Sequence, residues 1–331
     1  MFKALLDINT LSFPGIGIGE FQINETAFTV FGRGIAWYGI IVTLAIISVC
    51  SVIYAKSVKA GIRTDDILDY FIFCIVFGVV GARLYYLIFD GLGNYIHTDG
   101  DAWTNIRETF FNCIAVWRGG IAIYGGIIGV VATIFVVSKI KHIPALKILD
   151  MGGHAALLGQ AIGRWGNFVN AEAYGAETDV FCRMGIKNIL GVTHYYHPTF
   201  LYESLWNLIG FFVILKLIKR QKYDGQAFLW YVTWYGFGRM FIEGLRTDSL
   251  YIGSSGIRVS QLLAFCLFVG GVIVLSVIRF RRIKGVDAAA NGKTSYAAKA
   301  PADKGTTAGT GNVRRATVPK PDEERDNGDN N

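Results

Sequence analysis

The chain has 331 residues, of which 52% are hydrophobic and only 17% are charged. Its mean hydropathy is +0.40, whereas a typical soluble domain carries about 25% charged residues. This composition excludes an ordinary soluble protein. The net charge of +7 resides mostly in short Lys and Arg clusters that flank apolar segments. It therefore indicates membrane anchors and no nucleic-acid partner.

Seven apolar segments follow one another along the chain. A helix needs roughly 20 apolar residues to cross a bilayer core, and we predict spans at residues 36–55, 68–89, 120–138, 145–163, 200–218, 226–245 and 257–278. The fourth is the least apolar. The sequence therefore predicts an all-α polytopic membrane protein, a seven-transmembrane-helix bundle within a catalytic domain of residues 36–285.

The positive residues predict the orientation of this bundle. They follow the first, third, fifth and seventh segments, for example at Lys56, Lys139, Lys219 and Arg281. Short loops rich in Lys and Arg stay in the cytoplasm. We therefore expect the N-terminus outside and the C-terminus inside.

The two ends of the chain differ in composition from the apolar middle. Residues 1–35 show no long apolar run of a secretory signal and are predicted to form an external N-terminal arm, with a short strand around residues 21–29. Residues 286–331 are rich in Ala, Gly, Thr, Lys and Asp. Such a segment cannot bury enough apolar surface to fold alone, so a disordered cytoplasmic tail is predicted.

Unusual polar residues concentrate at the predicted outer ends of the spans. They are Tyr38, Arg83, Tyr124, Arg164, Asn167, Asn170, Glu172, Glu203, Arg239, Glu243 and Arg246. An Arg in mid-bilayer costs at least about 2.5–3.5 kcal/mol, so each of the Arg residues in apolar sequence is expected to have a partner. Arg239 and Glu243, four positions apart, share a helix face.

The guanidinium group binds phosphate through a planar fork of donors. The outer polar cluster therefore predicts a site for the head group of an anionic phospholipid. The competing interpretation is a set of structural ion pairs with snorkelling arginines. Glycines such as Gly163, Gly166 and Gly175 lie at the same predicted depth in the membrane as these polar residues. This arrangement favours a cavity over close helix packing alone.

The sequence predicts no metal site. It holds no CxxC and no HExxH motif, and its five His are scattered. Cys113 and Cys182 lie in predicted outer loops and could pair, although nothing in the sequence requires it.

Six stretches, in this order, are AWYGI, GARLYY, WRGGIAIYGG, GRWGNFVNAEAYG, HPTFLYES and GRMFIEGLR. Together they resemble the bacterial prolipoprotein diacylglyceryl transferase family over residues 35–283. The resemblance implies transfer of the diacylglyceryl group of phosphatidylglycerol to the lipobox cysteine thiol of a prolipoprotein. The product is a thioether, glycerol phosphate leaves, and no cofactor takes part.

The resemblance also implies where the reaction occurs. It suggests a seven-helix bundle in the bacterial cell membrane with its active site facing outward. A small extracytoplasmic head would come from residues 90–118 and 175–198.

The same resemblance assigns roles to residues. It places Arg164 and Asn167 in the head-group site, with Glu172 and Gly175 in support, and it makes Arg239, Glu243 and Tyr38 functional. The predicted catalytic residues are Tyr38, Tyr124, Arg164, Asn167, Arg239 and Glu243. The predicted phosphatidylglycerol-binding residues are Arg164, Asn167, Asn170, Glu172, Gly175, Arg239, Arg83 and Arg246.

The chain departs from the family pattern at two positions. Many members carry His where this chain has Tyr124, and Gln is common where it has Phe200. A free tyrosine titrates near 10 and is a poor base at neutral pH. We therefore expect Tyr124 to orient a substrate while Glu243 or Glu172 accepts the thiol proton.

Two other classes of function are compatible with the sequence. Asp150, His154 and Gln160 lie deeper in the fourth segment, and intramembrane polar residues also mark the paths of transporters and channels. No inverted repeat is visible to support that reading. A non-catalytic protein that only docks anionic lipid is the second alternative.

Overall fold

The computed structural model describes residues 8–116, 119–251 and 256–298, with side chains as far as residue 283. By its contacts the chain divides into two units, Met1–Arg279 and Phe280–Asn331. The first unit contains the described strands, the helices up to α8 and the start of α9 (Val259–Ala298). The second holds the end of α9, which continues beyond residue 286, where the tail was predicted to begin. Residues 299–331 of that tail lie outside the described residues.

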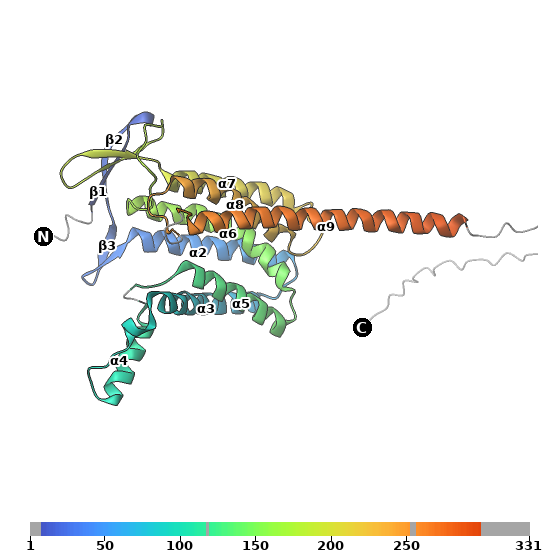
Figure 1. Ribbon diagram of the computed structural model, residues 1–331, viewed down its shortest axis with the longest axis horizontal. Coiled ribbons are helices and arrows are strands. Elements are labelled where there is room, and N and C mark those ends of the chain that lie inside the picture. Colours follow the sequence, from blue (N-terminus) through green and yellow to red (C-terminus); the bar gives the residue numbers. More distant parts are fainter. Residues whose placement is uncertain (1–7, 117–118, 252–255, 299–331) are drawn as a thin grey trace, which may run out of the picture. The chain divides into compact units, whose positions relative to one another are not determined.

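Each of the seven predicted apolar segments corresponds to a helix. The helices are α2 (Trp37–Lys59), α3 (Thr64–Asp90), α5 (Ile123–Lys141), α6 (Ala145–Val169), α7 (Thr199–Ile218), α8 (Gln226–Leu245) and α9 (Figure 1). Among the described residues, five are long and apolar enough to cross a membrane, namely α2, α3, α5, α7 and α9. The chain is therefore a polytopic membrane protein.

Helix α6 differs from its neighbours because it lies among them. It packs against α2, α7 and α8 and buries residues along most of its length, including Asp150, His154 and Ala161. A helix surrounded by protein can carry polar groups that a lipid-facing helix cannot. This explains its lower hydropathy. The helix also runs six residues beyond the predicted end at Gly163, so Gly163 and Gly166 are helical.

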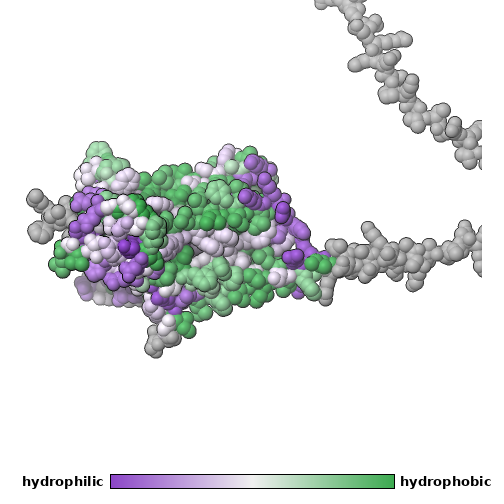
Figure 2. All heavy atoms as spheres, turned by 90° about the horizontal axis from the view of Figure 1, so that it is seen from above, coloured by the Kyte–Doolittle hydropathy of each residue, from purple (hydrophilic) through white to green (hydrophobic). Residues whose placement is uncertain are grey.

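An apolar belt covers the outside of the helices. Large hydrophobic side chains such as Ile72, Phe135 and Phe212 are exposed on α3, α5 and α7. Figure 2 shows hydrophobic residues over the helices and hydrophilic residues gathered at both ends of that region. This distribution is the reverse of a soluble protein and fits a hydrocarbon surrounding.

The fold also contains two small β-sheets, so the all-α prediction is wrong in this respect. A four-stranded antiparallel sheet has the order β2 (Ile18–Asn24), β1 (Ile8–Phe13), β5 (Met184–Lys187) and β6 (Thr193–Tyr196). Strands β3 (Thr26–Val30) and β4 (Arg33–Ala36) form a hairpin. The predicted strand at residues 21–29 covers parts of β2 and β3. The sheet joins the N-terminal arm to the segment between α6 and α7.

The other segment predicted to be external forms a helix of its own. This helix, α4 (Ala102–Ile114), follows a short 3₁₀ turn at Leu92–Tyr95. Helices α3 and α5, on either side of it in sequence, pack tightly together. A Cβ atom on Gly125 would lie 2.2 Å from the carbonyl oxygen of Gly81, so these glycines permit the backbones to touch.

Candidate functional site

A buried line of charges connects the end of α6, the start of α7 and the end of α8. The Glu203 carboxylate of α7 lies 2.6 Å from Arg164 Nη2 of α6 and 2.6 Å from Arg239 Nη1 of α8. Arg239 Nη2 lies 2.6 Å from Glu243 Oε2, one turn further along α8. The Glu203 and Glu243 side chains are 4% and 3% exposed. Two arginines thus share one buried carboxylate. We call the set of Arg164, Glu203, Arg239 and Glu243 the charged line.

Hydrogen bonds with polar side chains extend the charged line at each end. At the α6 end, Arg164 Nη1 donates to Asn167 Oδ1 at 3.1 Å, and Asn167 Nδ2 donates to Glu172 Oε1 at 2.8 Å. At the α8 end, Ser249 Oγ donates to Glu243 Oε1 at 2.8 Å. Glu172 is exposed, so the line runs from the buried interior to the surface.

Glu203 joins the two arginines, although from the sequence it was only one of the unusual polar residues and not among the predicted catalytic or lipid-binding residues. The arginines lie on helices whose sequences are far apart, and the residue between them comes from a third helix. The available signal was the isolated acid in HPTFLYES, which begins a long apolar helix. A lone carboxylate in such a position requires a cationic partner.

The segment after α6 is held in place by its backbone. Asn170 caps the helix, and Ala171 and Ala173 adopt left-handed conformations with φ of 46° and 56°. Such conformations are uncommon for residues with a Cβ atom. Thr199 Oγ1 donates to the carbonyl of Ala173 at 2.5 Å. The chain therefore leaves the helix at these alanines, whereas Gly163 and Gly166 remain within α6.

Gly175 packs where a side chain would not fit. Its N–H donates to the carbonyl of His197 at 2.9 Å, and a Cβ atom would lie 2.7 Å from His197 Cβ and 2.9 Å from the carbonyl oxygen of Leu245. The next residue, Ala176, donates its N–H to the carbonyl of Leu245. Gly175 therefore connects the end of the GRWGNFVNAEAYG stretch to the start of α7 and the end of α8.

The two predicted tyrosines have different surroundings. A Cβ atom on Gly166 would lie 2.8 Å from Tyr38 Cδ2, so the Tyr38 ring rests on α6 two positions from Arg164. The Tyr124 hydroxyl pairs with Ser260 Oγ at 2.9 Å. Tyr38 therefore packs on α6 at a point roughly 200° around that helix from Arg164, whereas the Tyr124 hydroxyl is directed to the start of α9.

Two predicted arginines have separate partners. Arg83 donates to the backbone carbonyls of Asn112, Cys113, Gly119 and Gly120 at 2.7–2.9 Å. Arg246 makes a bidentate pair with Asp248, at 2.9 and 2.6 Å. This guanidinium lowers the pKa of the Asp248 carboxyl. The structure does not bring either arginine into the charged line.

The deeper polar residues of α6 have structural partners. Asp150 accepts hydrogen bonds from the N–H groups of Gly225 and Phe228 at 2.7 and 2.8 Å and so satisfies the start of α8. His154 Nδ1 lies 2.7 Å from Lys56 Nζ. These contacts join neighbouring helices and are separate from the charged line.

A cavity of about 220 Å³ lies between α2, α6 and α7. Its walls include Ile41 of α2, Leu158, Ala161 and Trp165 of α6, and Ser204 and Leu208 of α7. Trp165 Nε1 donates to Ser204 Oγ at 3.2 Å, and Ser204 donates to the Ala161 carbonyl at 2.8 Å. The polar groups of this wall are therefore satisfied, and the cavity offers an apolar surface.

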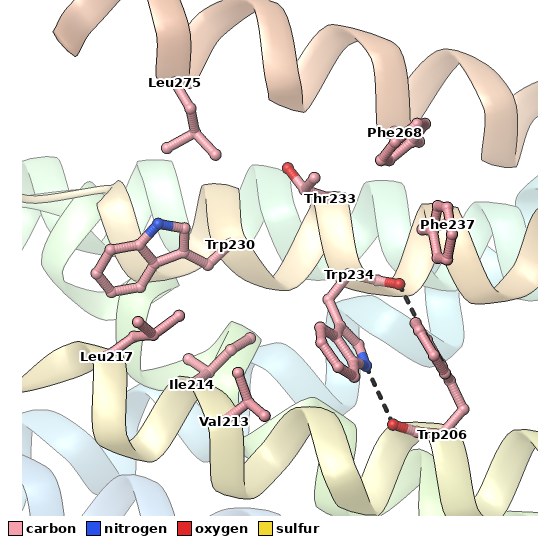
Figure 3. A pocket seen from close by; sticks show the side chains of 10 residues that line it. All are labelled: Trp206, Val213, Ile214, Leu217, Trp230, Thr233, Trp234, Phe237, Phe268 and Leu275. Carbon is pink, nitrogen blue, oxygen red and sulfur yellow. Dashed lines mark hydrogen bonds between the residues drawn. The ribbon is translucent and has the colours of Figure 1, made fainter.

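A larger cavity of about 310 Å³ lies between α7, α8 and α9 (Figure 3). Trp206 and Trp234 line it and donate to each other's backbone carbonyls at 3.0 Å. Phe237, which also lines it, is two positions from Arg239 and so lies roughly 200° around the helix. This cavity is therefore on the other side of α8 from the charged line.

Within the described ranges, no group of three or more His, Cys, Asp or Glu residues is placed to hold a metal ion. Cys113 and Cys182 are free thiols. Phe200 stacks on Phe168 with ring centroids 4.7 Å apart, which gives Phe200 a packing role.

Comparison with known proteins identifies similar chains. Residues 25–277 match the family model described as prolipoprotein diacylglyceryl transferase. Three similar curated proteins carry the name phosphatidylglycerol–prolipoprotein diacylglyceryl transferase. The one from Enterococcus faecalis is 38% identical over 78% of this chain and 91% of its own length. That from Listeria innocua is 37% identical over 81% and 94%, and that from Staphylococcus aureus is 38% identical over 81% and 93%.

Proposed function

We propose, from the premise that the chain belongs to the prolipoprotein diacylglyceryl transferase family, that it moves the diacylglyceryl group of phosphatidylglycerol to the lipobox cysteine of prolipoproteins. The observation that carries this proposal is the charged line, in which Arg164 and Arg239 meet at one buried carboxylate. Each guanidinium has five N–H donors. The described contacts of Arg164 use two of them, so donors are left for a phosphate.

The reaction is a displacement at carbon. The thiolate sulfur forms a bond to the terminal glycerol carbon of the diacylglyceryl group, while the bond from that carbon to the phosphate oxygen breaks. The thiol proton goes to a base, and the phosphate leaves as glycerol phosphate, which carries the bonding electron pair. Arg164 and Arg239 stabilise the charge that develops on the leaving oxygen. Glu203 keeps them adjacent.

The proposed base is Glu172. Glu243 is buried, and its two oxygens contact Arg239 and Ser249. Glu172 is exposed and accepts one hydrogen bond from Asn167, so one oxygen can accept the thiol proton. Asn167 would link this base to Arg164.

The other predicted residues support the same site. Tyr38 lies beside α6, where its hydroxyl could contact the lipid, and Asn170 could donate to ester or glycerol oxygens from the end of that helix. Gly175 fixes the loop that carries Glu172. We leave Arg83 and Arg246 out of the lipid site, because their donors hold a loop and Asp248.

The membrane arrangement is also a proposal. It places seven spans in the bacterial cell membrane, the N-terminal arm and the sheet outside, and the Lys and Arg clusters inside. The catalytic domain is proposed at residues 36–285 between an arm at 1–35 and a tail at 286–331. In this orientation the charged line faces the outer side, where the lipobox of a secreted protein emerges.

The two alternative functions receive less support. A transporter would use the deeper polar residues, but Asp150 and His154 bind neighbouring helices. A protein that only docks lipid would need the arginines but not a base at the end of the same network. Glu172 and Asn167 supply that further part.

The test is a transfer reaction with the full-length protein in phosphatidylglycerol vesicles and a lipobox peptide. We expect the peptide to gain the mass of a diacylglyceryl group, with or without a chelator. A peptide with Ser in place of Cys should remain unmodified. Absence of transfer to the Cys peptide, or equal transfer to the Ser peptide, would contradict the proposed function.

A further inference from the structure

The cavity between α2, α6 and α7 begins beside the charged line. Trp165 follows Arg164 on α6, and Ser204 follows Glu203 on α7; both Trp165 and Ser204 line the cavity. From Trp165 the cavity extends toward the other end of α6 as far as Leu158. At 1.5 Å per residue this is a depth of roughly 10 Å.

The rim and floor of this cavity suit hydrocarbon. Leu208 is 36% exposed and Trp165 is 44% exposed, whereas Ala161 beneath them is 4% exposed. The small Ala161 side chain leaves the hollow, and larger apolar side chains surround it. Its mouth is therefore open to surroundings that in a membrane are acyl chains.

A phospholipid has a fixed order of parts from the surface inward. Its phosphate lies outermost, its glycerol backbone follows, and its acyl chains extend to the bilayer centre. A lipid whose phosphate contacts Arg164 must place its chains further inward. The cavity at Trp165 and Leu158 lies in that direction, whereas the larger cavity lies on the other side of α8 from the charged line.

We infer that the cavity between α2, α6 and α7 holds part of one acyl chain of the phospholipid whose phosphate binds Arg164 and Arg239. This inference rests on the proposed function and extends it to a chain-binding subsite. Hydrocarbon leaves lipid for protein with little net hydrophobic gain, since lipid tails are as apolar as Leu. The subsite therefore acts by positioning: it fixes the reacting glycerol carbon relative to the arginines.

The first experiment uses phosphatidylglycerol with a photoreactive diazirine in the middle of one acyl chain. The full-length protein is irradiated in vesicles of this lipid, and labelled peptides are identified by mass spectrometry. We expect labels at Leu158 and Leu208. In Arg164→Gln the same labels should fall about tenfold, the factor that loss of one charge-assisted hydrogen bond costs, while labelling of Leu275 in the larger cavity stays constant.

Two results would overturn the inference. Labels at Leu158 and Leu208 that persist in Arg164→Gln would identify the occupant as bulk membrane lipid. Labels confined to Leu275 would place the bound acyl chain in the larger cavity between α7, α8 and α9.

The second experiment fills the cavity. Leu208→Trp should lower kcat with dioleoyl phosphatidylglycerol about tenfold, because a displaced chain misplaces the reacting carbon. Leu205→Trp is the matched control: Leu205 is on the same helix, is 49% exposed and lines neither cavity. Its kcat should equal that of the unmodified protein.

Equal kcat in Leu208→Trp and Leu205→Trp would refute the subsite. If the unmodified protein transfers no diacylglyceryl group from any phosphatidylglycerol, the proposed function itself fails. The two failures are therefore distinguishable.

Discussion

Replacing Glu203 with Gln removes the charge that holds the two arginines together. Each carboxylate oxygen lies 2.6 Å from a guanidinium nitrogen, and the Glu203 side chain is 4% exposed. Gln is nearly the same size but has one acceptor oxygen, and its NH₂ group would face a donor. One arginine therefore loses its partner in a buried position. Breaking a buried pair in this way costs about 3–5 kcal/mol.

We expect this cost to affect both stability and catalysis. Thermal unfolding of Glu203→Gln in detergent, followed by tryptophan fluorescence, should occur at a lower midpoint. The transfer rate should fall about 10²-fold, as when a preorganised donor is lost. Glu177→Gln is the control, because Glu177 is 67% exposed and pairs with His194 in the sheet region, and such surface pairs contribute about 0–1 kcal/mol. An unchanged midpoint and rate in Glu203→Gln would refute the assignment of Glu203 as the bridge.

Three further predictions concern single residues. Arg164→Ala and Arg239→Ala should each lower the transfer rate about 10²–10³-fold while the protein still inserts into the membrane. Lys219→Ala should leave the rate nearly unchanged. Equal losses in all three variants, measured with the same vesicle assay, would indicate a stability effect. Tyr124→His and Tyr124→Phe should keep substantial activity and Tyr124→Ala much less, whereas a loss in Phe as deep as in Ala, with folding intact, would make the hydroxyl central. Gly175→Ala should abolish transfer and lower the unfolding midpoint, because its Cβ would lie 2.7 Å from His197 Cβ; wild-type activity would show that the loop can shift.

The helices and one ion pair could be predicted from the sequence because both depend on local spacing. Long apolar runs specify helices in a membrane, and each of the seven lies on a helix. Residues four apart meet on one helix face, and the Arg239–Glu243 contact confirms this expectation.

Other features depend on segments that are distant in sequence. Strand β1 pairs with β5 across about half of the chain, and each strand is too short to give a clear alternating pattern. Glu203 joins two helices that no local rule relates. Arg83 was expected to contact lipid, yet the loop that supplies its four carbonyl partners adopts that position only in the folded chain.

The reciprocal pair of Trp206 and Trp234 has a consequence for motion. Their rings stack 4.4 Å apart and their indoles bond each other's helix, so α7 and α8 are expected to move as one body. Glu203 and Arg239 belong to that body, whereas Arg164 belongs to α6. When the bundle admits a lipid or releases a product, the Glu203–Arg239 separation should stay constant. The contact of Glu203 with Arg164 then connects this body to α6.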